Sequence, residues 1–226
     1  MDIKSKDFIV LIIFFHPTCK DIENALEISK KFNIFCFWNS NRIASELDSF
    51  SFFSDENAGL SKAYNYALNK FSESWILILD QDSRLDLNSI EALRKAAANT
   101  KDIMAICPIN SSKRGLFSVI SDEKYGFEWA ISSGTVINRR LALNIGGYNE
   151  NYFVDKVDYE FWWRASNYGY NPTVLSEVIM PHFYGLECNE AGKEYNLDRK
   201  IGQIFSRMRF IKDYYIYLFF KRLYQR

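Results

Sequence analysis

Two aspartates, Asp80 and Asp82, follow the uninterrupted apolar run from Trp75 to Leu79. A run this short and bulky is typical of a strand that is buried on both faces. Alternate strand residues point to opposite faces, so the two aspartates share one side. Two carboxylates on one side of a strand end suit a divalent cation that also holds a diphosphate. The same residues also fit an ordinary turn, in which Asp82 or Ser83 caps the next helix.

The elements around this run predict where it lies. Apolar strands alternate with amphipathic helices through the first half of the chain. We expect strands at 8–15, 34–38, 50–53, 75–79, 103–107 and 173–179, and helices at 20–32, 59–71 and 87–99. Such alternation predicts an α/β fold with a mostly parallel central sheet, right-handed crossovers and flanking helices.

Several polar residues follow the predicted strands and mark one rim of the sheet. Ligands of parallel sheets bind beyond the carboxyl ends of the strands, which places His16, Asn39 and Asn57 on the rim with the two aspartates. Asn57 and Gly59 fit a close approach of the backbone to a ligand. They fit equally well an ordinary helix entry that is capped by Asn57 or Ser61.

The second half of the chain is less regular. Signals are weak from 110 to 122, and we then expect regular structure at 127–131, a turn at 132–135, and helices at 138–145 and 157–168. His182 follows Pro181 at the end of the last strand. Its imidazole could complete a metal site or contact a diphosphate, or it could be a loop histidine bonded to backbone.

Composition narrows the class of protein. The 226 residues are 48% hydrophobic and 17% aromatic, enough to bury a large core, and 28 basic residues balance 28 acidic ones. No overall field therefore points to a nucleic-acid partner. The four cysteines lack metal-ligand spacing, which favours free thiols in a reducing compartment. The apolar run at 8–15 is too short to span a bilayer and lacks a cleavage site, so we expect a cytoplasmic protein.

The segment at 199–226 differs from the rest. It holds eight Lys/Arg and one Asp, a net charge of +7, and its apolar residues follow helical spacing. A basic, aromatic, amphipathic helix fits an anionic membrane surface, which would place the protein peripherally on the inner face of the cytoplasmic membrane. The alternative is a helix that packs on the protein's own core with its basic side in water.

An ordered set of motifs resembles the family-2 glycosyltransferases, and the rhamnosyltransferase-like branch in particular. The motifs are His16-Pro17 after the first strand, the segment 57–65, Leu79 to Ser83, Ser133-Gly134, the segment 146–150, and the segment 153–164. The resemblance covers roughly residues 8–185 and implies the GT-A fold, which is Rossmann-like. On this basis we expect a GT-A domain at 1–198, with a nucleotide-sugar-binding half at 1–109 and an acceptor-binding half at 110–198, before the helical tail at 199–226.

The resemblance also implies roles for residues. Asp82 resembles the carboxylate that binds manganese or magnesium, Asp80 resembles the position near the ribose or the metal, and Asp158 resembles the catalytic base. Asp155 is the competing candidate, because residues at i and i+3 can share one face of a helix. The remaining expected contacts to the nucleotide sugar are His16, Pro17, Asn39, Asn57, Gly59, Ser133 and Gly134, and His182 is a further candidate metal ligand.

The implied reaction moves a sugar from a nucleotide diphosphate sugar to a hydroxyl of a glycan or lipid-linked acceptor, with inversion, in bacterial surface polysaccharide or lipopolysaccharide synthesis. One departure is Trp38, which stands before Asn39 where the family has an acidic residue that helps to hold the base. Trp38 could stack on a base or fill the core. A non-catalytic sugar-binding or scaffolding subunit is therefore the alternative. A nucleotidyltransferase fits less well, because a Gly-rich basic loop is missing after the first strand.

Overall fold

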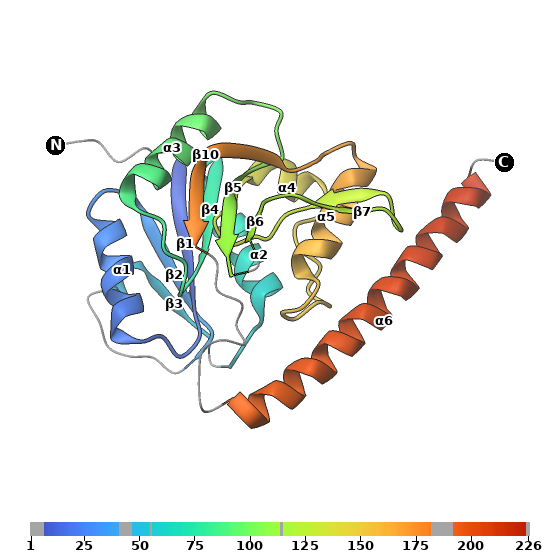
Figure 1. Ribbon diagram of the computed structural model, residues 1–226, viewed down its shortest axis with the longest axis horizontal. Coiled ribbons are helices and arrows are strands. Elements are labelled where there is room, and N and C mark those ends of the chain that lie inside the picture. The colour runs from blue at the N-terminus through green and yellow to red at the C-terminus, as the bar shows by residue number, and fades with distance from the viewer. Residues whose placement is uncertain (1–6, 41–46, 55, 114, 182–191, 225–226) are drawn as a thin grey trace.

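The computed structural model describes residues 7–40, 47–54, 56–113, 115–181 and 192–224, with side chains of the last helix described from Ile201 to Leu223. Within these residues, the central sheet has eight strands in the order β10-β5-β9-β4-β1-β2-β3, with β6 paired to β5 (Figure 1). Their bounds are β1 Phe8–Phe14, β2 Ile34–Trp38, β3 Ser51–Phe53, β4 Trp75–Asp80, β5 Ala105–Ser112, β6 Gly115–Phe117, β9 Val136–Asn138 and β10 Thr173–Pro181.

The strand directions give a mixed sheet that is mostly parallel. The pairs β1–β2, β1–β4, β2–β3 and β5–β10 are parallel. Strand β9 is antiparallel to both β4 and β5, and β6 is antiparallel to β5. A separate antiparallel pair joins β7 (Ile120–Asp122) to β8 (Phe127–Trp129). The predicted α/β class with a mostly parallel sheet and flanking helices is confirmed.

Helices cover both faces of the sheet (Figure 1). Their bounds are α1 Cys19–Ser29, α2 Leu60–Lys70, α3 Leu87–Ala98, α4 Arg139–Asn144, α5 Val157–Asn167 and α6 Gly192–Tyr224, with a short 3-10 turn at Asp48–Phe50. One buried apolar cluster joins the sheet to α1 and α3, and the other joins it to α2, α4 and α5. The two clusters are the two halves of the core.

Strand β4 shows how the sheet aims its polar end. Leu77 and Leu79 pack in the cluster with α1 and α3, whereas Ile76 and Ile78 pack in the cluster with α2 and α5. Side chains alternate along a strand, so Asp80 continues the row of Ile76 and Ile78. The polar end of β4 is therefore directed to the same side of the sheet as α2 and α5.

The structure adds elements that the periodicity did not indicate. Strand β5 continues to Ser112 and pairs with β6, where the sequence signals are weak, and β9 inserts between β4 and β5. Strands of three residues are too short to show a period of two. No helix in the described part of the chain is long and apolar enough to cross a membrane.

Helix α6 packs on the protein through one face. Phe210 is only 2% exposed, and its ring contacts those of Tyr159 and Trp163 at 4.7 and 5.4 Å. Tyr214 also packs against this cluster, and the hydroxyl of Tyr152 donates to Asp213 at 2.8 Å. The interpretation in which this helix packs on the core is thus correct for one side of it.

Candidate active site

The two carboxylates predicted to act together lie at the end of β4. Asp80 is the last residue of the strand and is half-buried, and Asp82 is exposed in the turn that follows. The turn is closed by a hydrogen bond from Ser83 N to Asp80 O at 3.0 Å. Gln81 Oε1 accepts from Phe15 N at 2.7 Å, which ties the turn to the end of β1.

Helix α3 is capped by a different residue from the two that the turn interpretation offered. Asp86 accepts from the backbone N–H groups of Asn88 and Ser89 at 2.8 and 2.9 Å. These hydrogen bonds hold the pKa of Asp86 below its ordinary value, and the bond from Ser89 has the largest effect. Asp82 and Ser83 therefore do not cap α3, and Asp82 keeps an exposed carboxylate at the rim.

This donor set fits a divalent cation of the manganese or magnesium kind. Such ions prefer oxygen ligands and often take only one or two protein carboxylates, completing their shell with water and phosphate oxygens. Asp80 and Asp82 offer that pair at one strand end. No group of three or more His, Cys, Asp or Glu residues gathers in the described part of the chain. His182, the other predicted ligand, lies outside the described residues.

The turn at Ser132 to Thr135 crosses the end of β4. Thr135 N donates to Ser132 O at 2.9 Å, and Gly134 has φ +80°, which a glycine adopts without strain. Gly134 N donates to Ile78 O at 2.8 Å. Ser133 Oγ accepts from Asp80 N at 3.2 Å and lies 2.5 Å from Ser83 Oγ. The predicted turn is confirmed, and it is anchored to the strand that carries Asp80.

Asp158 reaches the other side of the same turn. Ser132 Oγ donates to Asp158 Oδ1 at 2.5 Å. Removal from water raises the pKa of Asp158, and the hydrogen bonds from Ser132 oppose that rise. Burial of Tyr64 of α2, and then the nearby charges of Asp80 and Asp158, raise the pKa of its phenol well above the ordinary value. The structure thus brings Asp158 to the same region as the end of β4.

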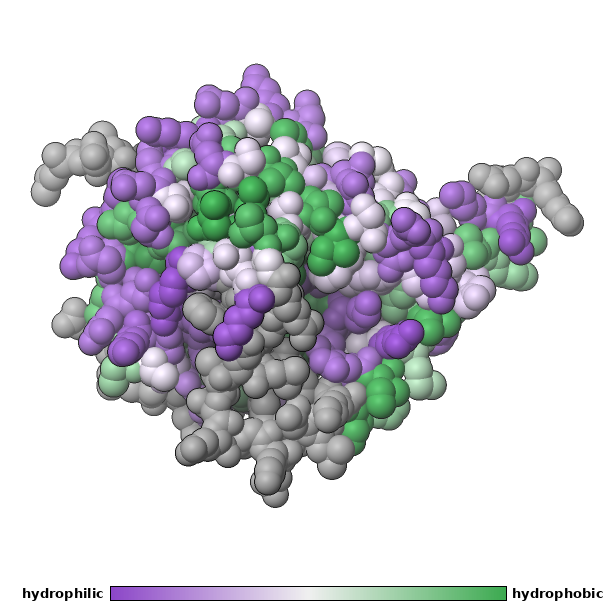
Figure 2. Space-filling model, in the orientation of Figure 1, coloured by the Kyte–Doolittle hydropathy of each residue, from purple (hydrophilic) through white to green (hydrophobic). Residues whose placement is uncertain are grey.

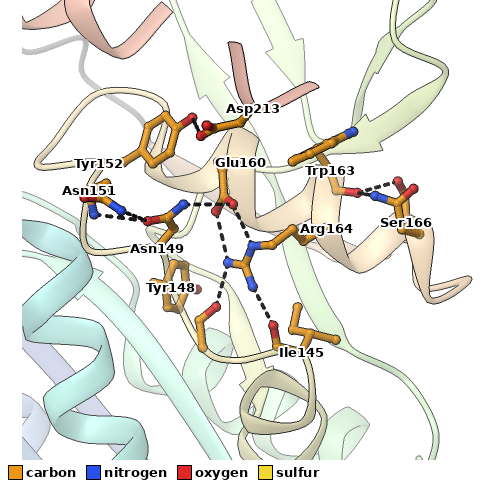
Figure 3. Close-up of polar contacts among 12 residues, drawn as sticks. Ile145, Tyr148, Asn149, Asn151, Tyr152, Glu160, Trp163, Arg164, Ser166 and Asp213 are labelled. Atoms are coloured by element: carbon orange, nitrogen blue, oxygen red, sulfur yellow. Dashed lines mark hydrogen bonds and ion pairs between the residues drawn. The ribbon is translucent and has the colours of Figure 1, made fainter. Parts of the chain in front are cut away.

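A buried ion pair holds the start of α5 in place (Figure 3). Glu160 is 2% exposed and receives two hydrogen bonds from Arg164, at 2.6 and 3.0 Å. Arg164 also donates to the carbonyls of Ile145 and Gly147 at 2.6 and 2.7 Å. The break at Gly146-Gly147 is therefore fastened to α5 by this pair.

The same segment is also fastened to α2. Asn65 donates to Tyr148 O and accepts from Tyr148 N, both at 2.8 Å. A Cβ added at Gly147, where φ is +68°, would lie 2.6 Å from Asn65 Oδ1. The ring of Tyr148 stacks on Phe161 with centroids 4.4 Å apart. The motif at 146–150 thus positions Tyr148 beside Ser132, with the two hydroxyl oxygens 3.5 Å apart.

Several residues predicted to contact the nucleotide sugar bind the protein itself. Asn39 is buried, accepts from Ala58 N at 3.0 Å and donates to Gly59 O at 3.3 Å. A Cβ at Gly59 would lie 2.6 Å from the ring of Phe153. Asn57 accepts from Gly59 N at 3.1 Å. The close backbone approach at Gly59 is therefore an approach to Phe153.

The rim after β1 is shaped by an unusual backbone. His16 is exposed and has φ +52°, and its N–H donates to Ser40 Oγ at 3.0 Å. Pro17 beside it is buried. The loop brings the ends of β1 and β2 together, and the His16 side chain remains at the surface.

Trp38 fills the core. It is fully buried, packs against Phe14 and Phe53 with centroids 4.7 and 5.4 Å apart, and donates from Nε1 to Ser51 Oγ at 3.0 Å. It does not reach the surface, so its ring does not stack on a nucleotide base here. Of the two interpretations of Trp38, core filling is correct.

Asp155, the competitor of Asp158, faces the last helix. Its Oδ1 accepts from Gln203 Nε2 of α6 at 3.3 Å. The residue before α5 is Lys156, in the left-handed conformation with φ +64°, so the chain turns sharply between Asp155 and Asp158. The two aspartates therefore do not share a helical face.

Sequence reasoning missed Tyr64, Ser132 and Tyr148. Tyr64 stands among Ala63, Ala67 and Leu68 on the buried side of α2, where it cannot be told from a core residue. Ser132 precedes the motif residue Ser133 and carried no signal of its own. Tyr148 did belong to a recognised motif, but only the packing of α5 on the turn shows that it meets Ser132.

The architecture defines a class, the GT-A fold. Three solved structures are similar over 77–78% of this chain at 13–14% identity. GalNAc-T7 with UDP, GalNAc and Mn²⁺ gives a TM-score of 0.61, and this chain covers 44% of it. The mannosyltransferase PcManGT of Pyrobaculum calidifontis with GDP-Man and Mn²⁺ gives a TM-score of 0.56, and this chain covers 56% of it. TarS 1–349 of S. aureus gives a TM-score of 0.53, and this chain covers 60% of it.

The sequence places the chain within that class. The profile of Glycosyl transferase family 2 matches residues 39–158, more than half of the chain, so the protein belongs to this family. The dTDP-rhamnosyl transferase RfbF of Shigella flexneri is 30% identical over 149 residues, which are 57% of this chain. The aligned part is 50% of RfbF, so the chain spans about half the length of this curated relative.

Proposed function

We propose that this protein is an inverting glycosyltransferase that moves a sugar from a nucleotide diphosphate sugar to a hydroxyl of a glycan acceptor in bacterial surface polysaccharide synthesis. The observation that carries the proposal is the turn at Ser132-Ser133. One serine holds Asp158 at 2.5 Å and the other holds the backbone of Asp80 at 3.2 Å. A carboxylate suited to proton transfer thus stands beside carboxylates suited to a cation.

The roles of the two acidic groups follow from their surroundings. When bound, the cation would be held by Asp82 and Asp80 and would stabilise the negative charge of the departing diphosphate. Asp158 takes the proton of the acceptor hydroxyl as the new bond forms, which is typically worth ~10²–10⁴-fold in rate. Attack from the side opposite to the diphosphate inverts the anomeric centre without a covalent enzyme intermediate.

The similarity to RfbF makes dTDP-rhamnose the first donor to test. The purified protein is heated with a panel of nucleotide sugars, with and without Mn²⁺, and a donor is identified by a metal-dependent rise in melting temperature. Slow donor hydrolysis is then followed by proton NMR. A released sugar with the anomeric configuration opposite to that of the donor supports the proposal. Metal-dependent binding without any turnover would favour the non-catalytic alternative.

We also propose that α6 holds the enzyme on an anionic membrane, where a lipid-linked acceptor would be found. The side of α6 opposite to Phe210 carries large apolar side chains in water. Seven of them are 42–64% exposed, namely Ile201, Ile204, Phe205, Met208, Tyr215, Phe219 and Leu223. Figure 2 shows apolar side chains along α6 among hydrophilic ones.

Charge supports this location. Exposed basic residues are distributed along α6, namely Arg207, Arg209, Lys212, Lys221 and Arg222. Each basic residue near an anionic surface is worth about 1 kcal/mol, and this attraction is screened by salt. The exposed aromatic rings add apolar area that a bilayer interface would cover.

Point substitutions test the membrane location better than removal of the helix, because α6 also packs on the core. Phe205→Glu with Phe219→Glu alters only side chains that are 64% and 61% exposed. This variant is expected to lose sedimentation with anionic vesicles at low salt and to keep its melting temperature. Tyr168→Glu, at 64% exposure but outside α6, is the matched control. Equal binding by all three proteins would contradict the membrane role.

A further inference from the structure

Two adjacent serines each form a hydrogen bond to a different acidic residue of the site. Ser132 and Ser133 are 4% and 5% exposed. The Oγ of Ser132 donates to Asp158 of α5, while the Oγ of Ser133 accepts from the backbone of Asp80 at the end of β4. The two elements are distant in the chain, and this turn is a direct hydrogen-bonded connection between them.

The turn itself is held rigidly. Its closing hydrogen bond, Thr135 N to Ser132 O, is 2.9 Å, and the side chain of Thr135 donates to Ile131 O at 2.6 Å. On the other side, Trp162 Nε1 donates to Ala130 O at 3.0 Å. Asp158 and Trp162 are four residues apart and so share one face of α5, which grips the segment from Ala130 to Ser132 at two points.

The Ser132 hydroxyl can donate its proton to only one of its neighbours. An ionised carboxylate only accepts hydrogen bonds, so the Ser132 hydroxyl donates to Asp158. The Tyr148 hydroxyl, 3.5 Å away, can therefore only be the donor in its contact with Ser132 Oγ. Tyr64 also contacts Ser132, and burial raises its pKa and that of Tyr148, so both phenols remain protonated donors.

We propose that Ser132 is the positioning residue for the catalytic base: it orients the Asp158 carboxylate through Oδ1 and, with Ser133, fixes its separation from the carboxylates of β4. This inference rests on the proposed function. It assigns Oδ2 of Asp158, the oxygen that does not accept from the Ser132 hydroxyl, to the acceptor hydroxyl. It also assigns the stacked Tyr148 and the buried Tyr64 to hold the Ser132 hydroxyl in the donating orientation.

Removal of the Ser132 hydroxyl has two expected effects. Asp158 loses the hydrogen bond that favours its ionised form, so its titration midpoint moves to higher pH. Its carboxylate is also held by one hydrogen bond fewer, which slows turnover without changing how the donor is held. A charge-assisted hydrogen bond of this kind corresponds to a loss of roughly 10-fold or more. The kcat should fall accordingly, with the KM for the donor unchanged.

The test compares Ser132→Ala, Ser132→Thr and Ser166→Ala. Threonine keeps a hydroxyl at position 132. Ser166 lies on the same helix as Asp158, but its hydroxyl donates to the backbone of that helix, at Trp163 O, 2.8 Å away. The Asp158 carboxyl is titrated by NMR in protein with ¹³C-labelled aspartate, its signal being the one lost in Asp158→Asn. Turnover of dTDP-rhamnose with Mn²⁺ is measured in parallel.

A rise of the Asp158 midpoint in Ser132→Ala, with recovery in Ser132→Thr and no change in Ser166→Ala, supports the proposal. An unchanged midpoint in a folded Ser132→Ala protein overturns it. If Ser132→Ala does not fold, Ser132→Cys replaces it, because a thiol is a weaker donor and should give a smaller rise. Absence of turnover of every nucleotide sugar in the panel by the unsubstituted protein would refute the proposed function, while the titration would still decide whether Ser132 holds Asp158.

Discussion

The end of β4 and the start of α5 each carry two acidic residues separated by one position, but the two pairs behave differently. Asp80 is the last residue of β4 and Asp82 lies in the turn that follows it, so both carboxylates stand at one end of that strand. Asp158 and Glu160 come from a helix, where a spacing of two residues turns the side chains about 200° apart. Asp158 therefore faces the Ser132 turn, and Glu160 faces Arg164 inside the protein.

The same spacing therefore leaves both carboxylates at one strand end in one place and separates the two side chains on a helix in the other. On α5, Glu160 is neutralised by Arg164 and serves packing, which leaves Asp158 as the acidic residue that points towards the end of β4. The surroundings of each carboxylate are set by the period of its backbone and by its neighbours.

The largest expected effect separates the two residues of α5. Asp158→Asn should lower turnover ~10²–10⁴-fold, because the amide cannot take the acceptor proton, and should leave metal-dependent donor binding unchanged. Kinetics and calorimetry with dTDP-rhamnose measure the two quantities. Asp155→Asn is the control and should remain active, since Asp155 contacts α6. An inactive Asp155→Asn beside an active Asp158→Asn would reverse the assignment.

The second expected effect concerns stability at the other carboxylate of α5. Arg164→Met removes the cation and leaves Glu160 charged and buried, which typically costs about 3–5 kcal/mol of the free energy of unfolding. Thermal and denaturant unfolding measure it. The double variant Arg164→Met with Glu160→Gln should recover part of that loss, because no charge is then left unpaired. A double variant less stable than Arg164→Met would contradict this explanation.

The third effect tests whether the β4 pair acts as a unit. Loss of a residue that only bonds to a metal ligand typically lowers metal affinity ~10–100-fold. Asp82→Ala removes a proposed ligand itself, so it should lower Mn²⁺-dependent donor affinity by at least that factor. The melting temperature without metal should stay the same. If the aspartates share one cation, Asp80→Asn with Asp82→Ala should bind no more weakly than the worse single variant. Additive losses, measured by calorimetry, would show that the two side chains act separately.

The smallest effect is a pH dependence of stability. Because removal from water raises the pKa of Asp158 above its ordinary value of 3.8, the folded protein binds that proton more tightly than the unfolded chain. The ionised form therefore costs stability at neutral pH, and the cost disappears as the pH falls through the raised pKa towards the ordinary one. Asp158→Asn should melt higher than the unsubstituted protein at pH 7, and the difference should shrink on acidification.

A melting-temperature difference that is flat or grows towards acid pH would contradict the raised pKa. The same titration predicts that turnover falls on the acid side as Asp158 becomes protonated. Asp155→Asn provides the reference curve, since it removes a carboxylate of the same type next to the same helix.

Much of the architecture could be predicted from local sequence. The runs that became β1, β2 and β4 begin where periodicity placed them, and α3 and α5 begin at the expected residues. Long apolar or amphipathic segments carry their own period, which is why they are predictable. Strand β9 is only three residues long, and it pairs with β4 and β5, which are distant from it in the chain. No local pattern in the sequence therefore predicts it.

The sequence by itself determined the order of strands and helices, the place of Asp80 and Asp82 at the end of a strand, and the amphipathic character of the final helix. These properties depend on the period of the backbone and on neighbouring residues. Only the tertiary structure decided that Trp38 fills the core, that Gly59 receives Phe153, and that Ser132 meets Asp158. Each of these contacts joins residues that are distant in the chain or depends on what surrounds them, and only packing of the sheet and helices brings them together.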